Sequence, residues 1–203
     1  MRKIFILDKR GLTLIEIIVS ISIFILVSLA AAEMMVKVFP SKRIIDEQLS
    51  SQSETRKVVD EFVNEIRGAT YSSIGGYPLA EASSTEIIFY SNLNAGTTRH
   101  RIRYFVSSTV MYKGLTEPTG NPLNYDPATE IVNPVLHGIV PTGAIFTYYD
   151  QAYTGSESPL TQPVETGLVR MVGIKVTIDK NPTISPTSFT TESKVVIRNL
   201  TDN

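Results

Sequence analysis

The chain has 203 residues, 42% hydrophobic and 19% charged, which is enough apolar surface for one sizeable core and too little charge for a disordered protein. Lys and Arg number 19 against 20 Asp and Glu, so the formal net charge is -1 and lacks the basic excess of a general nucleic-acid binder. The absence of Cys excludes disulfides and thiolate sites, and only two His argue against a histidine metal site.

A long apolar stretch follows a short basic N-terminus. Residues 12–32 read LTLIEIIVSISIFILVSLAAA, with Glu16 as their one charge and neither Gly nor Pro. As a helix they would extend roughly 32 Å at about 1.5 Å per residue, close to the hydrocarbon thickness of a bilayer. Four basic residues and one acid precede them: Arg2, Lys3, Lys9 and Arg10, and Asp8. Such a flank keeps the N-terminus in the cytoplasm, so we expect one membrane segment with the rest of the chain exported.

The residues alone leave the nature of this segment open. A Sec signal peptide would be cut at the small residues 30–32, and a plain signal anchor would stay uncut. Neither accounts for Glu16, because a carboxylate near the middle of an inserted segment costs about 2.5 to 3.5 kcal/mol. Glu16 also fits a helix cap, since Thr13-Leu14-Ile15-Glu16 matches the capping-box pattern.

The residues around Gly11 support a third interpretation. The run Lys9-Arg10-Gly11-Leu12-Thr13-Leu14-Ile15-Glu16 resembles the class III signal of type IV pilins and type II secretion pseudopilins. In that family a basic leader ends in Gly, and Glu is the fifth residue of the mature chain. Most members begin the mature chain with Phe, where this chain has Leu12.

The resemblance implies processing and assembly roles for three residues. A prepilin peptidase would cut between Gly11 and Leu12 and then N-methylate Leu12, and the small Gly11 would let it approach the backbone closely. In a filament, Glu16 would pair with the amine of the neighbouring subunit's Leu12, because a buried charge is tolerable only when it is paired. The helix cap is the plain alternative for Glu16.

Beyond the membrane segment the apolar pattern becomes amphipathic. Apolar residues recur at spacings of three and four: Ile45, Leu49, Val59, Phe62, Val63 and Ile66. We expect one long helix over about 12–69, bent at Pro40, with Gly68 and then Gly75-Gly76 marking its end. Two helices broken at Pro40-Ser41 are the alternative.

After Gly76 the pattern shifts toward a period of two, which predicts strands. The expected strands are 86–90, 101–106, 109–112, 144–149, 169–178 and 194–197. We expect a tight turn at Ser107-Ser108 and long surface loops over 115–141, which holds five prolines, and over 151–167. The predicted fold class is α+β and pilin-like, with a long N-terminal helix packed on a mainly antiparallel sheet.

Four parts are expected along the chain. Residues 1–11 form a cleaved leader, 12–32 a transmembrane and filament-core helix, 33–70 the exposed half of the helix, and 71–203 a β-rich exported domain. Removal of the leader takes away four basic residues and one acid and lowers the formal net charge from -1 to -4. We therefore expect no nucleic-acid partner.

Short motifs in the exported part are similar to those of J-type pseudopilins and W-type minor pilins. They are Ile66-Arg67-Gly68-Ala69, Ile87-Ile88-Phe89-Tyr90, Ile102-Arg103-Tyr104, Phe146-Thr147-Tyr148-Tyr149-Asp150 and Val195-Val196-Ile197-Arg198-Asn199. K-type pseudopilins lack a Glu at the position of Glu16, so Glu16 argues against the K type. Many major pilins close a loop with a disulfide, which the absence of Cys excludes here. This resemblance implies I- and K-type minor pseudopilins and the major pseudopilin as partners, together with prepilin peptidase and the membrane.

Outside the N-terminus the sequence offers few candidate sites. His100 is expected to be exposed at a strand start and His137 to lie in a loop, without spaced partners for catalysis or a metal. The i, i+2 spacing of Arg99, Arg101 and Arg103 would place all three on one strand face. That face is a candidate contact for acids of a partner subunit or for DNA, with a solvated surface as the plain alternative.

The sequence therefore predicts a structural subunit without enzymatic activity, cofactor or metal. It resembles a minor pilin-like protein of the J type that helps to initiate or cap a type II secretion pseudopilus or a type IV pilus. We expect a single pass through the inner (cytoplasmic) membrane, with the C-terminal domain outside the cytoplasm. The alternative is a Sec-exported or membrane-anchored β-domain that binds a ligand or a cell-wall component.

Overall fold

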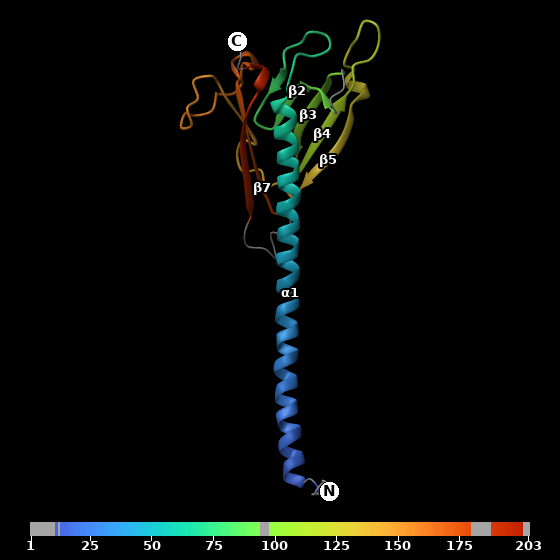
Figure 1. Cartoon of the computed structure of the whole chain (residues 1–203), viewed down its shortest axis with the longest axis vertical. Helices are drawn as coiled ribbons and strands as arrows, with labels where there is room; N and C mark the ends of the chain where they lie inside the picture. The colour runs from blue at the N-terminus through green and yellow to red at the C-terminus, as the bar shows by residue number, and fades with distance from the viewer. Residues whose placement is uncertain (1–10, 12, 94–97, 180–187, 201–203) are drawn as a thin grey trace, which may run out of the picture. The chain divides into compact units, whose positions relative to one another are not determined.

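The computed structural model describes residues 11, 13–93, 98–179 and 188–200, apart from the side chains of 37–41, 43 and 44. The chain divides into two compact units, Met1–Glu47 and Gln48–Asn203. Helix α1 (Leu14–Arg67) supplies the described part of the first unit beyond Thr13 and the opening segment of the second. Figure 1 labels α1 and five of the strands.

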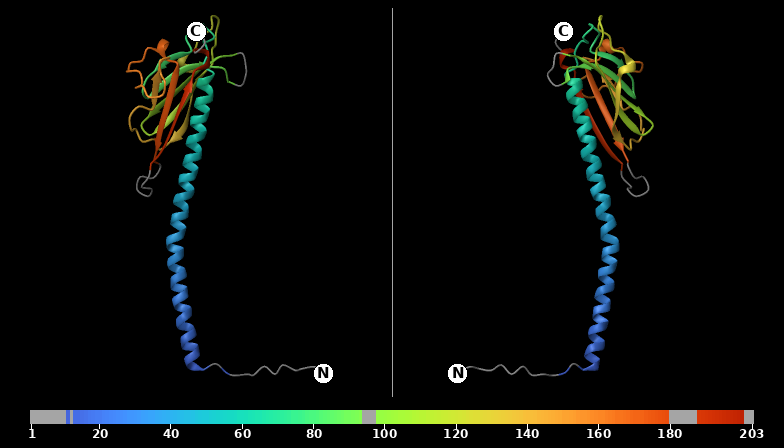
Figure 2. Two further views of the ribbon diagram at one scale, coloured as in Figure 1. Left: turned by 60° about the vertical axis from the view of Figure 1, so that its left-hand side comes forward. Right: turned by 90° about the vertical axis from the view of Figure 1, so that its right-hand side faces the viewer.

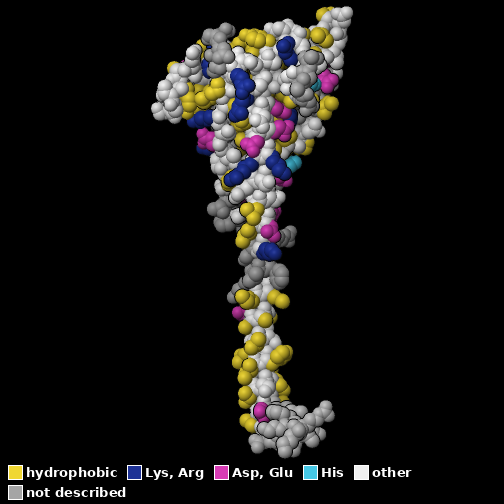
Figure 3. Space-filling view, viewed as in Figure 1, with side chains coloured by type: hydrophobic (Ala, Val, Ile, Leu, Met, Phe, Trp, Pro, Cys, Tyr) yellow, Lys and Arg dark blue, Asp and Glu magenta, His cyan; other side chains and the backbone are white. Residues whose placement is uncertain are grey.

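In the first unit the described side chains of α1 are exposed and mostly apolar. Leu14–Val36 is the one stretch of the described residues that is long and apolar enough to cross a membrane, with a mean hydropathy of 2.6 and no buried residue. Hydrophobic side chains, drawn in yellow in Figure 3, gather along this segment. The predicted long helix is confirmed, because α1 continues through Pro40, and the alternative of two helices broken at Pro40-Ser41 is wrong. The bend at Pro40 stays a prediction.

The second unit contains two antiparallel sheets among its described residues (Figures 1 and 2). The five-stranded sheet has the order β1-β2-β3-β4-β5, and its strands are β1 (Leu79–Ala82), β2 (Glu86–Ser91), β3 (His100–Ser107), β4 (Val110–Thr116) and β5 (Ile131–His137). The three-stranded sheet has the order β6-β7-β8, and its strands are β6 (Phe146–Tyr149), β7 (Met171–Ile178) and β8 (Phe189–Val196). Short 3-10 helices lie between β4 and β5 (η2, Pro127–Thr129), between β6 and β7 (η3, Thr166–Leu168) and after β8 (η4, Arg198–Leu200). The predicted α+β class is confirmed.

The loop predicted over 115–141 is wrong in its second half, because β5 lies inside it. β5 pairs with β4 from Leu115↔Ile131 to Met111↔Leu136, with an irregularity between Met111 and Tyr112. Proline is tolerated at a sheet edge, where its missing N–H leaves no ladder partner unsatisfied, and Pro134 occupies this edge strand. Pro134 therefore marks an edge strand, whereas the other prolines of this region lie outside the strands. The loop predicted over 151–167 is confirmed, since it contains no strand and only the start of η3.

Other differences concern strand ends and one turn. The prediction missed β1, which has four residues, and the polar part of β8, which pairs with β7 as far as Ile178↔Phe189. β4 also runs four residues beyond its predicted end. The turn between β3 and β4 lies at Ser108-Thr109, one residue later than expected, because Ser107 still pairs with Val110. Ser108 has a positive φ of 56°, which this two-residue hairpin requires.

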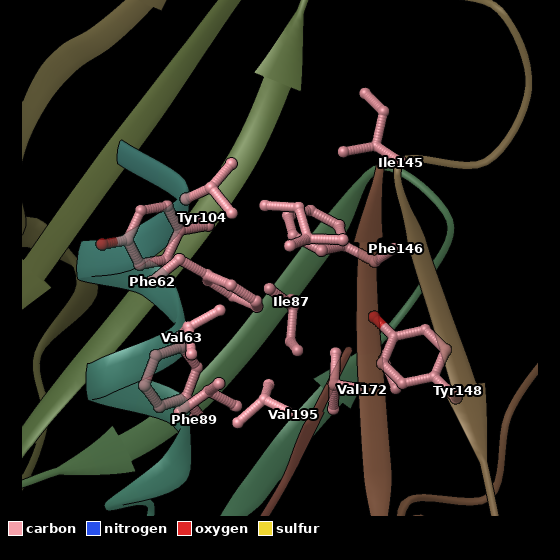
Figure 4. Close-up of a cluster of buried hydrophobic side chains, with 14 of the residues drawn as sticks. Phe62, Val63, Ile87, Phe89, Tyr104, Ile145, Phe146, Tyr148, Val172 and Val195 are labelled. Atoms are coloured by element: carbon pink, nitrogen blue, oxygen red, sulfur yellow. The ribbon is translucent and has the colours of Figure 1, made fainter. Parts of the chain in front are cut away.

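The core forms where α1 meets the inner faces of both sheets. The Phe62 ring is fully buried, with its centroid 6.2 Å from that of Phe89 on β2, 5.2 Å from Tyr104 on β3 and 5.5 Å from Phe146 on β6. Figure 4 shows Phe62 and Val63 projecting from the helix toward these strands. The spacing of Val59, Phe62, Val63 and Ile66 therefore buries one helix face against both sheets.

A charged cluster joins the same helix to the five-stranded sheet. Lys113 Nζ on β4 donates to Glu61 Oε1 and to Glu65 Oε1, each at 2.5 Å, and Tyr104 O–H donates to Glu65 Oε2 at 2.8 Å. The side chains of Lys113 and Glu65 are only 16% and 11% exposed. Burial raises the pKa of the Glu65 carboxyl, and hydrogen bonds from Lys113 and Tyr104 offset only part of that rise. Burial alone would lower the pKa of Lys113, but its bonds to Glu61 and Glu65 raise it overall.

We expect the substitution Lys113→Met to destabilise the second unit by about 3 kcal/mol, because it leaves the buried Glu65 carboxylate without its cation. The folded state holds the Glu65 proton to a higher pH than the unfolded chain does, so protonation of Glu65 favours folding as the pH falls. The loss of unfolding free energy caused by Lys113→Met should therefore be smaller at about pH 5 than at about pH 8. Urea unfolding of the full chain in detergent, followed by near-UV circular dichroism of its tyrosines, measures both.

The matched control is Lys57→Met, which removes an exposed lysine of α1 and should change stability by less than about 0.5 kcal/mol. Adding Glu65→Gln to Lys113→Met should recover part of the loss, because no buried charge then remains at this position. Equal losses for Lys113→Met and Lys57→Met would contradict the account of this cluster.

Candidate functional site

The processing site expected at the N-terminus is described only in part. Gly11 is exposed, and a Cβ atom added to it would meet no atom within 4 Å. Its φ does not fall in the positive range that favours glycine. Among the described residues, the fold therefore gives no steric reason for glycine at position 11, and its role in processing stays a prediction. Leu12 lies outside the described residues.

Glu16 takes part in a reciprocal cap at the start of α1. Glu16 N–H donates to Thr13 Oγ1 at 3.3 Å, and Thr13 N–H donates to Glu16 Oε2 at 3.4 Å. This arrangement is the capping box that the sequence pattern indicated, and it satisfies two of the free N–H groups at the helix start. Glu16 also lines a shallow surface recess of about 360 Å³ with Thr13, Ile15, Val19 and Ser20. The carboxylate is thus exposed and accessible to a second group from outside the chain.

Two of the three predicted arginines meet one glutamate on the five-stranded sheet. Arg103 donates to Glu130 from Nε at 2.8 Å and from Nη2 at 2.7 Å, a bidentate pair. Its Nη1 lies 3.6 Å from Glu86 Oε1, and its guanidinium carbon lies 3.9 Å from the centroid of Phe105. Arg101 Nη1 lies 3.8 Å from Glu130 Oε1. The hydrogen bonds to Glu130 raise the pKa of Arg103 above its ordinary value, so its charge is fixed.

Arg99 differs from the other two arginines. It precedes β3, its side chain is exposed, and its carbonyl accepts from Tyr125 O–H at 2.7 Å. The shared strand face is thus seen for Arg101 and Arg103, and both are paired with acids of this chain. A role of the three residues in partner contact stays a prediction, with Arg99 as the most exposed of them.

Sequence reasoning did not identify Glu130, or Gly114, whose missing side chain leaves room for it. Gly114 on β4 faces Glu130, and a Cβ atom at position 114 would collide with the Glu130 carboxylate. A glycine inside a strand often marks such a close approach, so Gly114 was the available signal. The Lys113 cluster had no comparable signal, because its members are separated by about 50 residues of sequence.

The two histidines lie in places that differ in part from the predicted ones. The expectation of an exposed His100 is wrong: its side chain is 14% exposed, Nε2 lies 3.4 Å from Glu117 Oε1, and Nδ1 is buried without a hydrogen-bond partner among the described residues. His137 is the exposed last residue of β5 and not a loop residue, because β5 extends through it. Within the described ranges, no group of three or more His, Cys, Asp or Glu side chains could hold a metal ion.

Comparison with known proteins bears on the N-terminal segment. Residues 7–32 match the family model described as the prokaryotic N-terminal methylation motif. The matched segment contains Gly11, Leu12 and Glu16 and ends within the apolar stretch Leu14–Val36. No curated protein matches the chain. The motif supports the resemblance to the type IV pilin-like family and indicates a prepilin-like substrate, and the α+β fold agrees with it.

Proposed function

We propose that this chain is a minor pilin-like structural subunit that is processed by a prepilin peptidase and assembled into a filament. The observation that carries the proposal is the methylation motif at residues 7–32, which overlaps the first part of a 54-residue helix. A secretory signal peptide is removed from the mature chain, whereas a pilin-like signal keeps its apolar helix. α1 is continuous from this segment into residues that build the core of the second unit, so a retained helix would link the membrane segment directly to that unit.

The exposed apolar side chains of the first unit require a non-aqueous environment. Phe24 is 72% exposed and Leu26 67%, and no described residue covers the segment Leu14–Val36. Each Å² of apolar surface left in water costs about 25 cal/mol, so a bare helix of this kind would not persist in solution. A bilayer before assembly and the helices of neighbouring subunits after assembly both provide such an environment. Before assembly we place the chain in the inner membrane as a single-pass protein, with its second unit outside the cytoplasm.

Glu16 would serve this function through its charge. In the single chain the carboxylate caps the start of α1, where the positive end of the helix dipole also favours it. In the packed interior of a filament, an unpaired carboxylate would be costly, and the methylated amine of the neighbouring subunit's Leu12 would neutralise it. Such a pair would fix the axial register of adjacent subunits.

Within this family we propose a J-type role, in which the chain initiates or caps a type II secretion pseudopilus or a related pilus with I- and K-type partners. Three of the five motifs similar to J-type proteins lie on β2, on β3 and on β6 with the residue after it, whereas the other two lie at the end of α1 and from the end of β8 into η4. Their aromatic members Phe89, Tyr104 and Phe146 surround Phe62. The function of the whole chain is then architectural, with the helix in the filament and the second unit available to partner subunits.

The mature N-terminus tests the proposal directly. We expect mass spectrometry of the protein from its native cells to find a chain that begins at N-methylated Leu12. The substitution Gly11→Ala should leave the fold unchanged, since a Cβ atom has room there, and should slow cleavage by hindering the peptidase. A wild-type chain that begins near Glu33 would contradict the proposal and favour a Sec-exported domain.

The two roles of Glu16 can be separated by two substitutions. Glu16→Gln removes the charge but keeps an oxygen that can accept from Thr13 N–H, and Thr13→Val removes the hydroxyl cap but keeps the charge. We expect Glu16→Gln to reduce incorporation into filaments strongly and Thr13→Val to reduce it little, with normal processing of both. Quantitative immunoblots of sheared filament fractions against membrane fractions measure this. Equal incorporation of both variants would leave Glu16 as a helix cap only.

A further inference from the structure

We draw no further inference here: the strongest candidate, the exposed apolar surface patch of Tyr71 and Ile74 in the loop between α1 and β1, carries none because nothing in the described part of the structure shows what covers it.

Discussion

The burial of Phe62 between the two sheets is the contact on which the second unit depends. Its ring packs on Phe89, Tyr104 and Phe146, which come from both sheets, so neither sheet could cover its inner face without the helix. The Lys113 cluster adds a polar constraint, because Glu61 and Glu65 lie one turn apart on the helix and share one lysine of β4. The later residues of α1 thus belong to the core of the second unit.

The same helix begins with a segment whose apolar side chains are not buried within the described chain. Leu14–Val36 exposes apolar side chains, whereas the helix residues from Val59 to Ile66 bury theirs within the second unit. One continuous α1 therefore connects the methylation motif to the folded core, which is what a subunit needs if it is to leave a bilayer and enter a filament. Glu16 and Thr13 form the reciprocal cap at the start of this helix, and the Glu16 side chain is exposed, so a second charged group could approach it without breaking the fold.

Local patterns predicted the parts of the fold that depend on local periodicity. The three- and four-residue spacing around Phe62 identified the buried helix face, the continuous β-branched and aromatic run around Phe89 identified β2, and the alternation around Tyr104 identified β3. β5 was missed because it is an exposed edge strand with Pro134 and little apolar alternation. Pairing over long sequence distances had little local signal: Lys113 is 52 residues from Glu61 and 48 from Glu65, and only the close approach of Glu130 was marked, by Gly114.

The central claim is that Leu14–Val36 packs against other subunits and is more than a lipid anchor. The chain has no Cys, so single cysteines placed at Ile18 and Ile25, which are 52% and 50% exposed, would be unique reactive groups. A membrane-permeant bismaleimide should then link the processed chain to other pilin-like subunits, with cysteines in their apolar helices, in cells that assemble the filament. Cells that lack the assembly ATPase should give few such links. The absence of links in both strains, with both cysteines reactive, would contradict the account.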